Sequence, residues 1–384
     1  MFTAMRSRRH FLMESSLMML AMMSASSCQL RQKTGIGKEH NALSAWHNSL
    51  WLPNWRMQKS LASALKALDG QCVTTLSPFW YEVDDTGTLR AKPGSDELAI
   101  PDRATIAALH KRGASVMPTL TTTLLPDNFI RLFAERAGQK RLAEAIRQEV
   151  LINGYDGIDL DLENIALTTE VSTAKKVREI YTDLCRCIAS ELNAVNKTLS
   201  ITVMARWSSR YEVWRSKLIP AVYDYEALSG IASVLRVMAY DQHAPNTPPG
   251  PIAGFRWVES ICDWTRRNVC SVDRVEIGIP LYGRDWGGGT VKSVLWDNMV
   301  QLRDMYPQSD VIYSDTEREI TFAYTDKEGS AHQVWYSNSQ SVTDRLALIQ
   351  SYGFRGAALW AASYESPDLW EKIGAVSSGV MPGK

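Results

Sequence analysis

Short apolar runs alternate with amphipathic stretches along most of the chain. The runs have the length of buried strands and occupy residues 49–52, 72–79, 115–121, 156–163, 199–204, 233–240, 274–282 and 354–361. Between most of them, apolar positions recur at helical spacing, as in residues 141–153, 174–195 and 341–352, and Gly353 follows the last of these as a helix C-cap would. Eight strands separated by helices predict an α/β fold, a (β/α)8 TIM barrel with its active site at the C-terminal strand ends.

The alternation is interrupted between the seventh and eighth predicted strands. Residues 287–340 contain two stretches of alternating polarity on either side of the turn sequence TDKEG. This pattern predicts a small α+β insertion with antiparallel strands. The insertion would either form one wall of a cleft at the barrel mouth or be a surface hairpin that only covers core.

The fourth predicted strand carries a column of acids. In its sequence DGIDLDLE, isoleucine or leucine fills every second position, so Asp159, Asp161 and Glu163 share the other face. Neighbours in this column are about 6 to 7 Å apart, because each is two strand rises from the next. Asp156 lies off this period, and we expect it to anchor the entry to the strand, although we also count it among the candidate substrate-binding residues.

Three carboxylates inside a barrel cannot all ionise at low cost. Burial and mutual repulsion raise at least one pKa, which keeps a proton available near neutral pH, as a general acid requires. A divalent cation is the alternative, but the order of the residues does not match a calcium-binding loop and no histidine lies nearby in sequence. A purely structural role would be costly, since burying acids is unfavourable. We therefore predict catalytic carboxylates without a metal or cofactor.

The first residues resemble an export signal. RSRRHFL precedes the short apolar run SSLMMLAMMSASS, so residues 1–28 are expected to direct export and residues 29–42 to form a polar spacer. Residues 7–12 resemble a twin-arginine motif, and the residues before Cys28 resemble a lipoprotein cleavage site. We expect a periplasmic or envelope location, with Cys28 as a possible site of lipid attachment; the alternatives are a plain cleaved signal and a disordered basic start.

Composition excludes some classes of partner. Lys+Arg and Asp+Glu are both 42, so nucleic acid is not an expected partner and the ligand should be neutral. The chain has 13 Trp and 14 Tyr, whose rings suit sugars as well as protein cores. The cysteines lack C-x-x-C spacing, which argues against a zinc site. Cys262 and Cys270 are the one pair worth testing for a disulfide, with buried thiols as the alternative. We expect a monomer.

Four segments resemble glycoside hydrolase family 18, the chitinase-like barrel enzymes. DGIDLDLE matches the family signature D-x-x-D-x-D-x-E, VMAYD (237–241) resembles its strand-six motif, and IGIPLYGRDW (277–286) and GAALWAASYE (356–365) resemble strands seven and eight. The resemblance covers about residues 45–375 and is greatest to the branch with spore-cortex and other peptidoglycan-directed hydrolases. Leu162 stands where chitinases typically have tryptophan, which favours peptidoglycan over chitin.

The resemblance implies a retaining, substrate-assisted hydrolase that cleaves β-1,4 linkages after N-acetylglucosamine. In such enzymes the 2-acetamido oxygen of the substrate attacks the anomeric carbon. Glu163 would protonate the glycosidic oxygen and later activate water. Asp161 would orient the acetamido group and share a proton with Asp159 below it.

Other residues are expected at the substrate. By the same resemblance, Tyr240 and Asp241 would contact the acetamido group and Trp360 would form the floor of the cleaving subsite. Further candidates lie at predicted strand ends or in the insertion, where they would contact sugar or pack in the core: Tyr282, Trp80, Trp286 and Trp335. Two alternatives remain, a chitinase or chitooligosaccharide hydrolase and a glycan-binding lectin on the same barrel.

Overall fold

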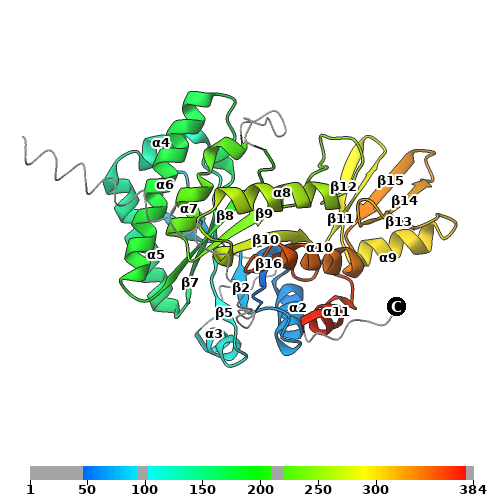
Figure 1. Ribbon diagram of the computed structural model, residues 1–384, viewed down its shortest axis with the longest axis horizontal. Helices are drawn as coiled ribbons and strands as arrows, with labels where there is room; N and C mark the ends of the chain where they lie inside the picture. Colours follow the sequence, from blue (N-terminus) through cyan, green and yellow to red (C-terminus); the bar gives the residue numbers. More distant parts are fainter. Residues whose placement is uncertain (1–45, 93–102, 209–218, 378–384) are drawn as a thin grey trace, which may run out of the picture. The chain divides into compact units, whose positions relative to one another are not determined.

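The computed structural model describes residues 46–92, 103–208 and 219–377. The predicted signal, spacer and Cys28 lie outside these ranges. A curled parallel sheet with helices on its outside forms the main body, so the predicted (β/α)8 barrel is confirmed (Figure 1). Its strands are β1 (Ser49–Leu52), β2 (Thr75–Pro78), β5 (Ser115–Val116), β6 (Thr119–Thr122), β7 (Gly157–Asp161), β8 (Thr198–Met204), β9 (Val234–Met238), β10 (Val275–Pro280) and β16 (Gly356–Trp360).

The third predicted strand is divided into β5 and β6, and this segment closes the sheet. β5 pairs with β2, whereas β6 pairs with β7. Between them, the Met117 N–H donates to Leu76 O at 2.9 Å and Pro118 O accepts from the Asp159 N–H at 2.9 Å. One stretch of chain therefore bonds to both neighbours, while β1 pairs with β16 on the opposite side.

The helices cover the outer face of the barrel. They are α2 (Met57–Asp69), α3 (Arg103–His110), α4 (Pro126–Phe133), α5 (Arg136–Asn153), α6 (Val171–Asn193), α7 (Tyr225–Ile231), α8 (Phe255–Asn268), α10 (Ser339–Ser351) and α11 (Leu369–Ser377). In α5, Leu142, Ile146 and Val150 recur every four residues and are buried against the sheet. Short 3₁₀ turns include η1 (Asn54–Arg56) after β1, η2 (Asn164–Ala166) after β7, η3 (Ile219–Val222) and η4 (Val272–Arg274). Within the described ranges, no helix is long and apolar enough to cross a bilayer.

The chain between β10 and β16 forms the predicted insertion, with more strands than the sequence indicated. It contains a five-stranded antiparallel sheet made by β11 (Gly283–Gly287), β12 (Thr290–Val294), β13 (Ile312–Tyr313), β14 (Ile320–Thr325) and β15 (Ala331–Tyr336), together with α9 (Trp296–Met305). Figure 1 shows these elements in yellow and orange. The insertion has its own small core, which includes Met299, Phe322 and Val334. The main sheet also contains a hairpin of β3 (Tyr81–Val83) and β4 (Leu89–Ala91), which joins it through β3 beside β6 and was not predicted.

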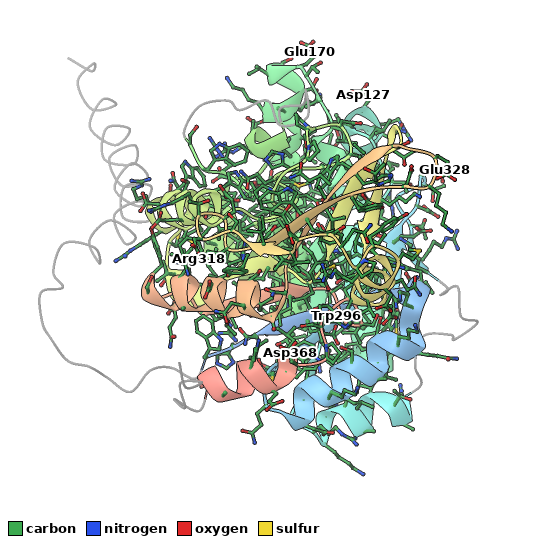
Figure 2. The ribbon with its side chains drawn as sticks, turned by 90° about the vertical axis from the view of Figure 1, so that its right-hand side faces the viewer. Asp127, Glu170, Trp296, Arg318, Glu328 and Asp368 are labelled. Atoms are coloured by element: carbon green, nitrogen blue, oxygen red, sulfur yellow. The ribbon has the colours of Figure 1, made fainter. Side chains whose placement is uncertain are left out.

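Apolar side chains fill most of the interior, although a few charged side chains, such as Arg345 and Glu319, are also fully buried. One continuous cluster of buried residues joins the strands to the helices around the barrel. Charged residues such as Asp127, Glu170 and Glu328 lie instead at the periphery and are exposed to solvent (Figure 2). Among the described residues, no disulfide forms, and Cys262 is buried on α8. The alternative of buried thiols therefore holds for Cys262, and no disulfide joins it to Cys270.

Candidate active site

A pocket of about 570 Å³ lies at the C-terminal ends of the barrel strands. The strands and the loops that follow them contribute Asp161, Glu163, Met204, Met238, Tyr240, Asp241, Tyr282, Trp360 and Tyr364. The turn η1 contributes Trp55 and Arg56, and the insertion with its neighbouring chain contributes Arg284, Ser293, Leu295 and Asn298. The insertion therefore forms one wall of this pocket, which is the first of the two roles considered from the sequence.

Asp159 lies below the pocket, inside the barrel. Its carboxylate is fully buried and accepts from Trp51 Nε1, Thr119 Oγ1 and Thr202 Oγ1, each at 3.1 Å. Arg236 Nη1 adds an ion pair at 3.3 Å. Four donors therefore bind this one carboxylate and fix its position at the base of the column.

Arg236 is shared between two buried acids. Its Nε lies 3.1 Å from Glu276 Oε2, and its Nη1 donates to Ser77 Oγ at 2.7 Å. Glu276 also accepts from the Ser49 hydroxyl. Arg355 Nε lies 3.6 Å from the other oxygen of Glu276, Oε1, so two arginines and two acids form one network below the pocket.

Asp161 lies directly above this network and lines the pocket floor. Its side chain is buried, and Oδ1 has no hydrogen-bond partner among the described residues. Burial raises the pKa of Asp161 well above its usual range, and the charges of Glu163 and Asp159 raise it further, while Arg236 partly opposes them. Asp161 therefore tends to keep a proton where an exposed aspartate would not. Glu163, two residues after Asp161 and just beyond the end of β7, lines the same pocket.

Tyr240 faces the acids from the end of β9. Burial raises the pKa of its hydroxyl well above the usual value, so the group stays protonated and can donate a hydrogen bond. Gly278 on β10 leaves room for this ring, because a Cβ there would lie 2.8 Å from Tyr240 Cε1. The lack of a side chain at Gly278 thus makes room for the observed position of the Tyr240 ring.

Asp241 is held by two neighbours. Its backbone is left-handed, with φ of 61°, and its Oδ1 accepts from the Tyr282 hydroxyl and from Arg284 Nη2, the latter at 2.6 Å. The carboxylate is therefore already neutralised by a guanidinium. It joins the end of β9 to the start of the insertion.

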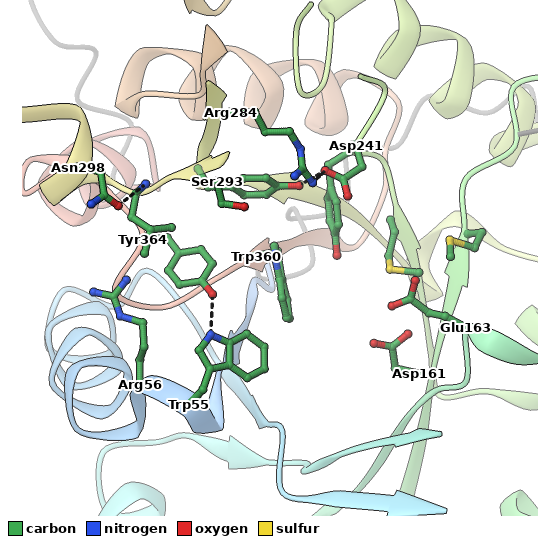
Figure 3. Close-up of a pocket in the computed structure, with 15 residues that line it drawn as sticks. Trp55, Arg56, Asp161, Glu163, Asp241, Arg284, Ser293, Asn298, Trp360 and Tyr364 are labelled. Atoms are coloured by element: carbon green, nitrogen blue, oxygen red, sulfur yellow. Dashed lines mark hydrogen bonds and ion pairs between the residues drawn. The ribbon is translucent and has the colours of Figure 1, made fainter. Parts of the chain in front are cut away.

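An aromatic group forms the remaining surface of the pocket. Trp360 lies with its ring centroid 5.0 Å from Phe79, 6.2 Å from Trp55 and 6.4 Å from Tyr364. Trp55 Nε1 donates to the Tyr364 hydroxyl at 3.2 Å. Figure 3 shows Trp360 between the acids on one side and Trp55 with Tyr364 on the other. Such faces suit the apolar side of a sugar ring.

The structure does not bring four of the predicted substrate-binding residues to the pocket. Asp156 lies at the N-terminal end of β7, where Oδ2 accepts from the Val116 N–H at 2.8 Å and lies 2.9 Å from His110 Nε2, so its position is that of an anchor. Trp80 is 3% exposed and packs on Tyr155. Trp286 and Trp335 pack against the main core, and their indole nitrogens are buried.

The pocket also contains residues that the sequence analysis missed. Trp55 and Arg56 follow the first strand, and Tyr364 follows the last. Their positions just after barrel strands were a usable signal, since those ends meet at the mouth of the barrel. Arg284 and Asn298 had no such signal, because their place depends on how the insertion folds over the barrel.

A column of acids beside an aromatic floor at the mouth of a (β/α)8 barrel is the arrangement of a carbohydrate-cleaving enzyme. The sequence model of glycosyl hydrolases family 18 matches residues 56–365. The chain therefore belongs to this family and is a glycoside hydrolase, which confirms the resemblance described above.

Individual relatives are distant in sequence. The cortical fragment-lytic enzyme of Bacillus anthracis is 24% identical over 328 residues, which cover 83% of this chain and 71% of that protein. The structure of a chitinase from Chromobacterium violaceum has a TM-score of 0.72 at 22% identity and covers 86% of this chain and 98% of that one. The structure of the Bacillus cereus spore cortex-lytic enzyme SleL has a TM-score of 0.71 at 21% identity and covers 86% of this chain and 74% of that one. These structures share the fold.

Proposed function

We propose that the protein cleaves β-1,4 linkages after N-acetylglucosamine with retention of configuration, using the acetamido group of the substrate as nucleophile. The observation that carries this proposal is the state of the pocket carboxylates. Asp161 ends β7 and Glu163 follows it by two residues, whereas Asp241, the other carboxylate of the described pocket, is bound to Arg284 and Tyr282. A two-carboxylate retaining enzyme needs a free nucleophile across the sugar. Asp241 is not free, so the substrate must supply that group.

The proposed roles follow the positions of the side chains. Glu163 protonates the glycosidic oxygen and then activates water. Asp161, whose Oδ1 has no partner among the described residues, accepts the acetamido N–H and orients its carbonyl oxygen. Its proton is shared along the column with Asp159. The attack by the acetamido oxygen and the later attack by water each invert the anomeric carbon, so the net result is retention.

Two further groups support the intermediate. The protonated Tyr240 hydroxyl donates to the acetamido oxygen, and donors of this kind stabilise developing charge in a water-poor site. Trp360 supports the sugar in the cleaving subsite by stacking. Asp241 acts through Tyr282 and Arg284, which it fixes at the wall of the pocket.

We further propose peptidoglycan as the polymer, ahead of chitin. Support comes from Leu162 in place of the tryptophan typical of chitinases, and from the relative named a cortical fragment-lytic enzyme. The first alternative is hydrolysis of chitin or chitooligosaccharides. An exported, envelope-associated protein with a lipid on Cys28 fits such a substrate. An unmodified mature N-terminus at another residue, measured by mass spectrometry, would refute the lipid.

The test compares the wild type with Glu163→Gln on N-acetylglucosamine oligomers and on isolated peptidoglycan strands. We expect the wild type to release products with N-acetylglucosamine at the new reducing end and initially in the β configuration, by mass spectrometry and NMR. Glu163→Gln should lose at least about 100-fold in kcat. The control Glu170→Gln changes an exposed acid outside the pocket and should keep full activity. Binding of either polymer without cleavage would instead identify a lectin.

A further inference from the structure

Arg56 lies at the end of the pocket opposite the acids. Figure 3 shows Asp161 and Glu163 on one side of Trp360, and Arg56 on the other side with Trp55 and Tyr364. The guanidinium stands over the Tyr364 ring, 5.6 Å from its centroid. A glycan that stacks on Trp360 and extends away from Glu163 would therefore reach Arg56.

The charge of Arg56 has no close partner. In the part of the chain that the structure describes, its ion pair is with Asp297 Oδ2 at 4.0 Å, and that carboxylate is 65% exposed and also pairs with Lys59 at 3.5 Å. Exposed pairs of this kind contribute little. Arg284, the other arginine in the pocket, is by contrast bonded to Asp241 at 2.6 Å. Arg56 thus offers several N–H donors and a full charge to a ligand, although its side chain is only 19% exposed.

Local helix stability does not explain an arginine here. Arg56 is the N-cap of α2, a position that favours Ser, Thr, Asp or Asn, and its side chain makes no capping bond. A positive charge at a helix N-terminus is also unfavourable, because that end of the helix dipole is positive. The first turn of α2 has no acid to compensate it. The residue therefore works against the helix that it begins.

We propose that Arg56 binds a carboxylate of an acidic sugar next to the N-acetylglucosamine that is cleaved, and so selects peptidoglycan over chitin. This inference rests on the proposed function. In peptidoglycan, N-acetylglucosamine alternates with a muramyl sugar whose lactyl group ends in a carboxylate or carries a peptide with carboxylates of its own. Chitin has neither. A guanidinium binds a carboxylate through two parallel hydrogen bonds, which suits Arg56 to this role.

The experiment measures kcat/KM on peptide-free glycan strands, on the same strands with their lactyl carboxylates amidated, on peptide-bearing strands and on neutral N-acetylglucosamine oligomers. We expect the wild type to prefer the acidic strands over the amidated ones by about 10-fold or more, the size of a charge-assisted hydrogen bond. Arg56→Gln should abolish this preference, and Arg56→Lys should keep part of it. A preference that appears only with peptide-bearing strands would place the carboxylate on the peptide.

The matched control is Lys59→Gln. Lys59 pairs with the same Asp297 but does not line the pocket, so its removal should leave the preference intact. Equal rates of the wild type on acidic and amidated peptide-free strands and on peptide-bearing strands would overturn the inference, as would an Arg56→Gln variant that keeps the preference. Cleavage of the neutral oligomers but of none of the strands would overturn the role of Arg56, while the proposed hydrolase activity would stand. Failure to cut any of these substrates would refute the proposed function itself. If Arg56→Gln does not fold, the substrate preferences of the wild type and of Arg56→Lys still test the inference.

Discussion

Arg236 Nη1 lies 3.3 Å from Asp159 Oδ2, and these two side chains are 1% and 0% exposed. The same guanidinium also bonds to Glu276, which lies 3.6 Å from Arg355 Nε as well, so Arg236 joins two buried acids beneath the pocket. Ion pairs of this kind contribute modestly when complete, but removal of one partner leaves uncompensated charge in the interior.

Arg236→Met should therefore lower the free energy of unfolding by about 3–5 kcal/mol. Urea unfolding followed by circular dichroism measures this loss. The control Arg186→Met removes an exposed arginine that pairs with Asp183, and it should change stability by less than about 0.5 kcal/mol. A similar small change in Arg236→Met would show that the network is not needed for stability.

Asp161→Asn should change how stability depends on pH. The pKa of Asp161 is raised in the folded protein, so the native state binds a proton that the unfolded chain releases above about pH 4. The contribution of this group is complete below that pH and is lost as the pH rises through the folded pKa. Each unit of upward shift corresponds to about 1.4 kcal/mol.

The thermal midpoint of the wild type, relative to that of Asp161→Asn, should consequently decrease as the pH is raised above about 4. Paired melting curves at several pH values give this difference directly and cancel the other titrating groups. A difference that stays constant, or that grows with pH, would mean that Asp161 is ionised in the free enzyme.

Tyr240→Phe should reduce kcat by about 100-fold while the fold is retained. The change removes a neutral hydroxyl that we propose donates to the acetamido oxygen, and loss of one such donor costs about 10²–10³ in rate. Kinetics on N-acetylglucosamine oligomers test it. Tyr155→Phe, a buried change outside the pocket, serves as control. An unchanged kcat in Tyr240→Phe would remove Tyr240 from the proposed mechanism.

Gly278→Ala should reduce activity through Tyr240. The new Cβ would lie 2.8 Å from both Tyr240 Cε1 and Val237 O, so the ring and the neighbouring β9 backbone must shift, at a cost of about 1–3 kcal/mol in stability. Gly230→Ala is the matched control, since its Cβ would meet Cys270 Sγ at an ordinary 3.5 Å. If activity survives in Gly278→Ala, the ring position is not critical.

The strand pattern predicted the barrel and the acid column because both depend on local periodicity. Buried parallel strands read as apolar runs, and the two-residue alternation in β7 placed Asp159 and Asp161 on one face. The division of the third strand into β5 and β6 could not be predicted from the sequence, since it depends on which neighbouring strand each part pairs with. The added strands of the insertion were missed for the same reason.

The prediction of the site residues was limited mainly by the direction of side chains that follow a strand end. Phe79 and Trp80 are adjacent after β2, yet Phe79 packs on Trp360 while Trp80 packs on Tyr155. Alternation does not continue reliably once a strand has ended, so the choice between them needed the fold. Trp55 and Arg56 were overlooked although they occupy a comparable place after β1.

The pairing of β1 with β16 also determines when the enzyme can first act. Trp55 and Tyr364, which are hydrogen-bonded in the pocket, are 309 positions apart in sequence. A growing chain therefore has no complete pocket until its last strand has been made and has found the first. Such distant pairing makes folding slow. Degradative activity is thus withheld from every unfinished copy of the protein.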